Sequence, residues 1–238
     1  MIPASAAAIQ LGLAAWLPAS MLDWPGRIAT TAFVRGCPFR CAYCHNPDLL
    51  FPGPSEDVDA LMHHLESRRG WLDGLVITGG EPTADPSLLP FLAAVKEARI
   101  PVKLDTNGSQ PDILGRILEE RLVDMVAMDV KTLPERYDAL TGVAGSHDAV
   151  ERSIRLVIGS GIEHEFRTTA WPGALTIEDF PRIAASLVGA DRYVIQQFRA
   201  AQTLDPSAGS VLPFHTDALR DAARQCNRFV PTILRGAV

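Results

Sequence analysis

The stretch IATTAFVRGCPFRCAYCHNP, residues 28–47, joins an apolar, β-branched run to a loop that holds three of the chain's four cysteines. The run at 28–36 has the composition of a buried strand, and it ends at a glycine. Directly after this glycine, the spacing C-x3-C-x2-C places thiols at Cys37, Cys41 and Cys44. We therefore predict a strand that carries a cysteine loop at one edge of a sheet.

Strand-like and helix-like segments alternate along the rest of the chain. Short apolar or β-branched runs that end in glycine or polar residues recur at 74–80, 102–108, 125–131, 163–170 and 192–198. Between them, apolar residues recur at helical spacing within 58–65, 88–95, 113–118 and 150–158. Because strands that alternate with helices form parallel βαβ units, we expect six parallel strands covered by helices.

Polar side chains on these strands concentrate on one face. Side chains alternate between the two faces of a strand, and one face collects Lys103, Asp105, Asn107, Asp129, Lys131, Glu163, Glu165, Arg167 and Thr169. An open doubly wound sheet would tend to bury both faces in apolar contacts, whereas a barrel can hold a ligand at its mouth. The predicted fold class is α/β: a partial (β/α)6 TIM-like barrel of parallel strands with outer helices.

The sequence contains no linker or charge block that would divide it. We expect one domain over 1–238, with a leading strand or hairpin at 1–27, the partial barrel core at 28–200 and a closing segment at 201–238. The closing segment contains a candidate helix, PFHTDALRDAARQCNRF, and a candidate strand, FVPTILRG. Cys226 lies in that helix, where we interpret it as a small core residue.

Charge and hydropathy exclude several kinds of protein. A formal net charge of −6 gives no reason to expect nucleic-acid binding, which usually needs a basic face. The apolar run at 6–18 lacks the preceding positive charge of a signal peptide, since the first basic residue is Arg27. This run is also too short to span a bilayer. We expect a cytoplasmic protein without a membrane partner.

Three clustered cysteines point to a metal site. An iron–sulfur cubane needs four ligands, so three thiolates would leave one iron open to a small molecule at the predicted barrel mouth. A zinc site made of the three cysteines and His45 is the alternative, although structural zinc usually draws paired cysteines from separate segments.

Beyond these patterns, the chain resembles a known family. C-x3-C-x2-C with Tyr43 before its last cysteine, followed by TGGEP, resembles the radical S-adenosylmethionine (radical SAM) enzymes. The further segments SMLDWPGRIATTAFVRGCPFRCAYCHNPDLL, TGGEPT, VKLDTNGSQP, VDMVAMDVK, EFRTT and QQF resemble the anaerobic ribonucleoside-triphosphate reductase activating proteins. These proteins are relatives of the pyruvate formate-lyase activating enzymes. The resemblance runs from about residue 19 to residue 200.

The resemblance implies two cofactors. Cys37, Cys41 and Cys44 would hold a [4Fe-4S] cluster, and S-adenosyl-L-methionine (SAM) would bind its fourth iron. One electron would then cleave SAM to methionine and a 5′-deoxyadenosyl radical. Some activating enzymes carry extra cysteine motifs before GGEP, but residues 45–73 contain no cysteine, so we expect one cluster only.

The resemblance also implies which residues contact SAM. Tyr43 would lie beside the adenine, and the GGEP turn would hold the amino group, with Glu81 bracing the turn. The implied SAM-binding residues are Tyr43, Gly79, Gly80, Glu81, Pro82, Asn107, Lys131, Arg167 and Gln197. His45 and Asn46 are interpreted as residues that fix the cysteine loop.

A monovalent cation is a further implied ligand. Asp105, Thr106, Met128 and Asp129 resemble the Na⁺ or K⁺ site of the pyruvate formate-lyase activating enzymes, and oxygen ligands suit such a hard cation. The alternative is that Asp105 and Asp129 pair with Lys103 and Lys131, because buried charges need partners.

The function that the resemblance implies is activation of a glycyl radical enzyme. The radical would abstract hydrogen from a backbone glycine of a partner, an anaerobic ribonucleoside-triphosphate reductase, with flavodoxin or ferredoxin as electron donor. Two alternatives stay open: a radical SAM enzyme that acts on a small molecule, similar to 7-carboxy-7-deazaguanine synthase, and a non-catalytic metal-binding protein.

Overall fold

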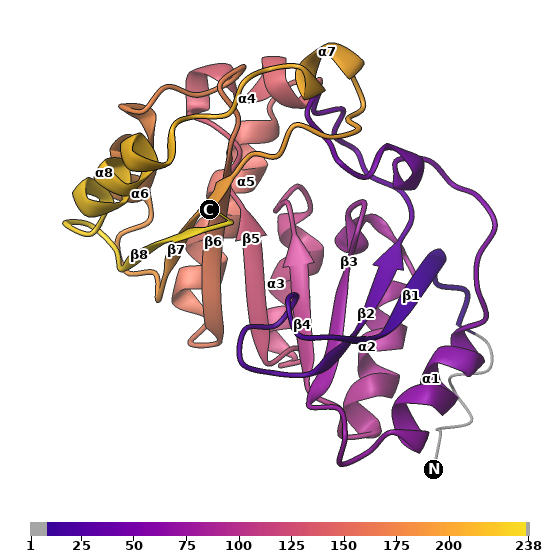
Figure 1. Ribbon diagram of the computed structural model, residues 1–238. Coiled ribbons are helices and arrows are strands. Elements are labelled where there is room, and N and C mark those ends of the chain that lie inside the picture. The colour runs from indigo at the N-terminus through magenta and orange to yellow at the C-terminus, as the bar shows by residue number, and fades with distance from the viewer. Residues whose placement is uncertain (1–8, 237–238) are drawn as a thin grey trace.

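Eight strands form one sheet in their order along the chain (Figure 1), within residues 9–236, the part that the computed structural model describes. The first pair, β1 (Leu13–Ser20) and β2 (Ala29–Val34), is antiparallel. All later neighbours are parallel: β3 (Gly74–Gly79), β4 (Val102–Thr106), β5 (Met125–Asp129), β6 (Glu163–Ala170), β7 (Tyr193–Gln197) and β8 (Thr232–Arg235). No pairing among the described residues joins β1 to β8, so the barrel is open between these strands.

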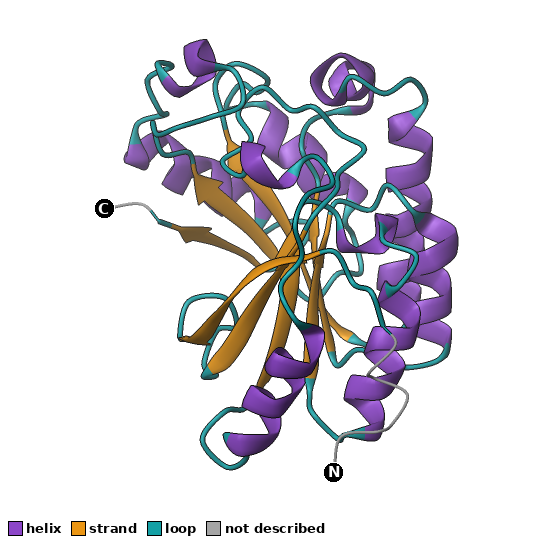
Figure 2. Cartoon of the chain, turned by 90° about the vertical axis from the view of Figure 1, so that its right-hand side faces the viewer, coloured by secondary structure: helices purple, strands orange, loops and turns teal. Residues whose placement is uncertain are grey.

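Helices follow most of the strands and cover the outer face of the sheet. They are α1 (Val58–Ser67), α2 (Leu88–Glu97), α3 (Pro111–Glu119), α4 (Pro134–Thr141), α5 (Ser146–Gly159), α6 (Asp179–Ser186), α7 (Pro206–Gly209) and α8 (Thr216–Cys226). Figure 2 shows most of the long helices to the right of the sheet. Within the described residues, no helix has the length and apolar character needed to cross a membrane.

The fold class predicted from the sequence is confirmed. Each of the six expected strands is present, ending one or two residues earlier in most cases, and the closing segment supplies α8 and β8 as expected. The leading strand is β1, and the part of that prediction that concerns residues 1–8 lies outside the described residues. Cys226 is fully buried in α8, as expected of a core residue.

The outer face is held by apolar packing between sheet and helices. Leu61 of α1, Phe91 of α2 and Ile117 of α3 are all fully buried, as are Leu104 and Val126 on the strands beneath. Together they belong to one continuous hydrophobic core. Burying such side chains contributes roughly 1.5–3 kcal/mol each, so the sheet's helix-covered face supplies most of the stability.

The inner face of the sheet is apolar at the amino ends of the strands and polar at their carboxyl ends. At the amino ends of the parallel strands, Trp24 from the β1–β2 loop packs with Ala29, Val76 and Met125 in a separate buried cluster. The carboxyl ends of the same strands carry polar and charged side chains instead, such as Asp105. Trp24 thus closes one end of the barrel, and the other end remains for the site.

Candidate functional site

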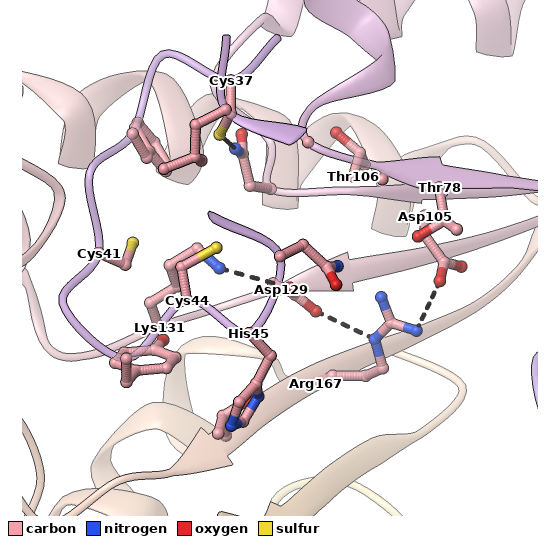
Figure 3. Close-up of a pocket in the computed structure, with 18 of the residues that line it drawn as sticks. Cys37, Cys41, Cys44, His45, Thr78, Asp105, Thr106, Asp129, Lys131 and Arg167 are labelled. Atoms are coloured by element: carbon pink, nitrogen blue, oxygen red, sulfur yellow. Dashed lines mark hydrogen bonds and ion pairs between the residues drawn. The ribbon is translucent and has the colours of Figure 1, made fainter. Parts of the chain in front are cut away.

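The cysteine loop begins where β2 ends and folds back on itself before η2 (Pro47–Leu49). The backbone N–H of Gly36 donates to the carbonyl of Leu49 at 2.8 Å, and that of Cys37 donates to Leu50 at 3.2 Å. Between these two anchors the loop carries its cysteines over the carboxyl ends of the strands. Figure 3 shows the sulfur atoms of Cys37, Cys41 and Cys44 turned into the same space.

That space is a cavity of about 260 Å³ at the mouth of the barrel. The cysteine loop forms one wall, and the ends of β3 to β7 form the others. Besides the three cysteines, its lining includes Phe39, Tyr43, His45, Asn46, Leu50, Thr78, Gly79, Gly80, Asp105, Thr106, Asn107, Asp129, Lys131, Arg167, Thr169 and Gln196. Residues that are far apart in the sequence therefore meet in one cavity.

Two of the three thiols, those of Cys37 and Cys41, have a raised pKa. Burial, assisted by the charge of Glu81, raises the pKa of Cys37 to about 12, and burial also raises the pKa of Cys41. A thiol in such surroundings keeps its proton until a bound metal compensates the thiolate charge. Across residues 9–236, no three His, Cys, Asp or Glu side chains converge as ligands of a single ion. The three thiols instead border a cavity, an arrangement that fits a cluster of several atoms.

The two glycines of the GGEP turn pack directly against the start of the cysteine loop. A Cβ on Gly79 would collide with the backbone of Val34, and a Cβ on Gly80 would collide with the carbonyl of Gly36. Gly79 also has a φ of +124°, which L side chains rarely adopt. The glycines therefore have a structural role, and their backbone is left exposed to the cavity.

Glu81 is fully buried and is held by four hydrogen bonds. Its Oε1 accepts from the backbone N–H of Thr83 at 3.1 Å and from the hydroxyls of Thr83 and Thr106 at 2.5 and 2.6 Å. Its Oε2 accepts from the backbone N–H of Asn107 at 2.6 Å. Burial raises the pKa of Glu81, and these donors oppose that rise. The carboxylate thereby ties the GGEP turn to the end of β4.

A chain of alternating charges lies along the cavity floor. Arg167 donates from Nε to Asp129 and from Nη1 to Asp105, both at 3.0 Å (Figure 3). Lys131 Nζ lies 3.4 Å from Asp129, and Lys103 pairs with Asp105. Burial alone would raise the pKa of both aspartates, but the neighbouring cations outweigh it and lower the pKa of each carboxyl group.

This arrangement bears on the expected cation site. The pairing of Asp105 and Asp129 with Lys103 and Lys131, the alternative that the sequence left open, is present in the structure. Arg167 adds a third positive charge between the two carboxylates. The negative charge that a monovalent cation would need is therefore already balanced by protein side chains.

Three further expected residues lie at the cavity wall. Tyr43 is buried, and its ring centroid is 5.2 Å from that of Trp171. The side-chain amide of Asn107 lies 3.5 Å from the sulfur of Cys37. His45 also lines the cavity, and its Nε2 is 3.0 Å from the carbonyl of Arg199, which fixes the ring above Phe198.

Gln197, which the sequence predicts as a SAM contact, lies outside the cavity. Its amide donates to the carbonyl of Phe214 at 3.1 Å, and it is not among the residues that line the cavity; Gln196 is. The strand register gives the reason, since Gln196 is paired with Thr169, which lies on the inner face. Pro82 and Met128 also lie outside the cavity lining.

Comparison with known proteins finds one matching family and two similar proteins. Residues 31–187 match the model of the "Radical SAM superfamily". A protein of Methanocaldococcus jannaschii with the provisional name of glycyl-radical enzyme activating enzyme is 27% identical over 221 residues, which cover 90% of this chain and 91% of the relative. A pyruvate formate-lyase-activating enzyme of Clostridium pasteurianum is 32% identical over 130 residues, 51% of this chain and 53% of that protein.

Solved structures share the fold. SuiB of Streptococcus suis superposes with a TM-score of 0.64 at 15% identity, over 85% of this chain and 47% of that chain. Coproporphyrinogen III oxidase of Escherichia coli gives a TM-score of 0.57 at 14% identity, over 88% of this chain and 54% of the other. The chain spans about half the length of these two proteins, and at such low identity the likeness concerns the fold alone.

Proposed function

The chain belongs to the radical SAM superfamily, and from this premise we propose that it activates a glycyl radical enzyme. The observation that carries the proposal is the meeting of three cysteines from one loop, a glycine turn and a charged strand edge around one cavity. The similarity to the glycyl-radical enzyme activating enzyme of M. jannaschii supports it, because that similarity spans nearly the whole of both chains.

Within this proposal, Cys37, Cys41 and Cys44 hold one [4Fe-4S] cluster and leave one iron free for SAM. When bound, cluster and SAM supply a carbon-centred radical that abstracts a hydrogen atom. The burial of Cys37 and Cys41 suits such a cluster, because it raises the pKa of both thiols and would so couple their deprotonation to metal binding.

The other cavity residues would bind and orient SAM. The open backbone at Gly79 and Gly80 admits a ligand at close range, since no Cβ intervenes. Lys131 and Arg167 offer positive charge to its carboxylate. Tyr43, whose ring packs against Trp171, offers an aromatic surface to its adenine. These residues would hold SAM in position and exclude water. A radical reaction gains its selectivity from such positioning.

The proposed substrate is a backbone glycine in a loop of a partner protein. In this proposal the loop would approach the inner face on the side where β1 and β8, the two end strands of the sheet, do not pair. The finer proposal names an anaerobic ribonucleoside-triphosphate reductase as partner and flavodoxin or ferredoxin as electron donor. It rests on the sequence segments that resemble the activating proteins of that reductase.

Anaerobic reconstitution tests the proposal. Protein rebuilt with iron and sulfide, then given SAM and dithionite, should release 5′-deoxyadenosine, and addition of the reductase should produce a glycyl radical visible by electron paramagnetic resonance. If 5′-deoxyadenosine were released but no protein radical formed, the reductase would be refuted as partner. The proposal that the protein cleaves SAM would still stand. Purified protein that carries zinc, or a cluster whose spectrum ignores SAM, would refute both.

A further inference from the structure

Glu165 is a fully buried carboxylate that receives its counter-ion from the far end of the chain. It lies on the inner face of β6, and Arg235 of β8 donates two parallel hydrogen bonds to it, Nη1 to Oε1 and Nη2 to Oε2, both at 3.1 Å. Arg192 is a more distant neighbour, with Nη1 at 3.7 Å from Oε2. Because β7 lies between β6 and β8, Arg235 reaches across one strand to make this bidentate pair.

The same carboxylate lies close to the charges at the cavity. Arg167 follows Glu165 by two residues on the same strand face, and the charge of Glu165 acts on Arg167 together with those of Asp105 and Asp129. Asp129 and Asp105 already use Nε and Nη1 of this guanidinium, and Glu165 is a third carboxylate whose charge acts on it. A buried carboxylate with too little compensating charge is costly, so a Glu165 that kept only the more distant Arg192 would compete for Arg167.

We propose that Arg235 is a positioning residue for the cavity: by neutralising Glu165, it keeps Arg167 on Asp105 and Asp129. These two carboxylates and Arg167 line the space in which SAM is proposed to bind. Arg235 lies beyond residues 31–187, the part that matches the family model. The closing segment therefore contributes to the site through charge as well as by completing the sheet. This inference takes its ligand, SAM, from the proposed function.

Substitution of Arg235 tests the inference in the full-length protein. We expect Arg235→Gln to turn Arg167 toward Glu165 in a crystal structure and to weaken SAM binding to the reconstituted protein about tenfold, measured by calorimetry. The iron content should be unchanged, because the cysteine loop is not touched. Arg235→Lys should lose less affinity, since it keeps the charge and gives up the bidentate geometry. Arg228→Gln is the matched control, an exposed arginine of the same segment that should bind SAM as the wild type does.

The double variant Glu165→Gln/Arg235→Gln separates positioning from simple stability. With Glu165 neutral, nothing competes for Arg167, so SAM affinity should return to within about twofold of wild type. A double variant that binds as weakly as Arg235→Gln would overturn the inference, as would an unmoved Arg167 in the crystal structure of the single variant. The crystal structure needs no SAM, so it decides the inference even if wild-type protein fails to bind SAM and the proposed function falls.

Discussion

The two ends of the barrel's inner face are built from the same strands but carry different residues. At the amino end, Trp24 packs on Val76 and Met125, sealed from solvent. At the carboxyl end, Asp105 and Asp129 face a cavity that the cysteine loop covers. Stability and chemistry are therefore separated along the strand direction. Substitutions at the amino end should change stability and leave SAM binding unchanged, whereas substitutions at the carboxyl end should change the binding of iron and SAM.

The largest effect is expected at the cysteine loop. Replacing Cys41 with alanine removes one of three thiols from the cavity, and a cubane held by two protein ligands should not persist. Iron content after anaerobic reconstitution should fall to background, and formation of 5′-deoxyadenosine should stop, while the far-ultraviolet circular dichroism spectrum stays that of the wild type.

Cys226 offers the matched control for this change. It is fully buried in α8 and does not line the cavity. Cys226→Ala should keep wild-type iron and lose about 1 kcal/mol of unfolding free energy. If Cys41→Ala also kept its iron, the cluster could not be held as proposed.

At the opposite end, the expected loss concerns stability. Trp24→Ala would empty the buried cluster at the amino ends of the strands, which should lower the free energy of unfolding by about 3–5 kcal/mol. SAM affinity of the remaining folded protein should be unchanged, because no cavity residue is disturbed. Urea unfolding and calorimetry measure the two effects separately.

Trp71 provides the comparison for Trp24, because it is 81% exposed. Trp71→Ala should change the free energy of unfolding by no more than about 0.5 kcal/mol. A loss of SAM affinity in Trp24→Ala, at a temperature where the protein is fully folded, would show that the two ends are coupled.

A substitution in the GGEP turn should have a smaller effect, and it should change both the stability of the protein and its iron content. An alanine at position 80 would collide with the carbonyl of Gly36, and its Cβ would lie 2.9 Å from the carbonyl of Leu49. We expect Gly80→Ala to cost about 1–3 kcal/mol of unfolding free energy. It should also reduce iron content, because the collision pushes the cysteine loop away from β3.

Gly115 is the control for this glycine. It lies within α3, and a Cβ there would have its nearest neighbour at an ordinary 3.7 Å. Gly115→Ala should stabilise the protein by about 0.5–1 kcal/mol, since alanine loses less chain entropy in a helix. Equal behaviour of the two variants would contradict the close packing at Gly80.

Local patterns in the sequence were enough to predict the strands and most of the residues that line the cavity. Each strand's alternation marks its polar face, and the cysteine spacing together with the GGEP motif marks the loops that border the cavity. Asp105, Asp129, Lys131 and Arg167 were expected on these grounds, and the structure brings them together.

What the sequence did not provide is register and long-range pairing. Gln196 and Gln197 are adjacent glutamines at a strand end, and only the pairing of Gln196 with Thr169 tells which one faces inward. The pair of Glu165 with Arg235 joins residues 70 positions apart. No local period encodes such a contact, because it depends on β8 being placed next to β7.

The smallest predicted effect is a dependence of stability on pH at the carboxyl end. Burial would raise the pKa of Asp105, but Arg167 and Lys103 outweigh burial and hold it below its ordinary value, about 3.9 in unfolded chains. The folded protein therefore binds fewer protons at this group than the unfolded chain does. The resulting stabilisation is complete above the unfolded pKa and is lost as the pH falls through the folded pKa.

Urea unfolding between about pH 5 and pH 3 measures this contribution. The free energy of unfolding should fall less steeply with decreasing pH in Asp105→Asn than in wild type. One proton accounts for a difference of at most about 1.4 kcal/mol per pH unit. Glu81, whose pKa is raised by burial, acts in the opposite direction but is present in both proteins, so it cancels in the comparison. Identical slopes would mean that Asp105 gains no stabilisation from Arg167 and Lys103, and the charge network at the cavity would then serve binding alone.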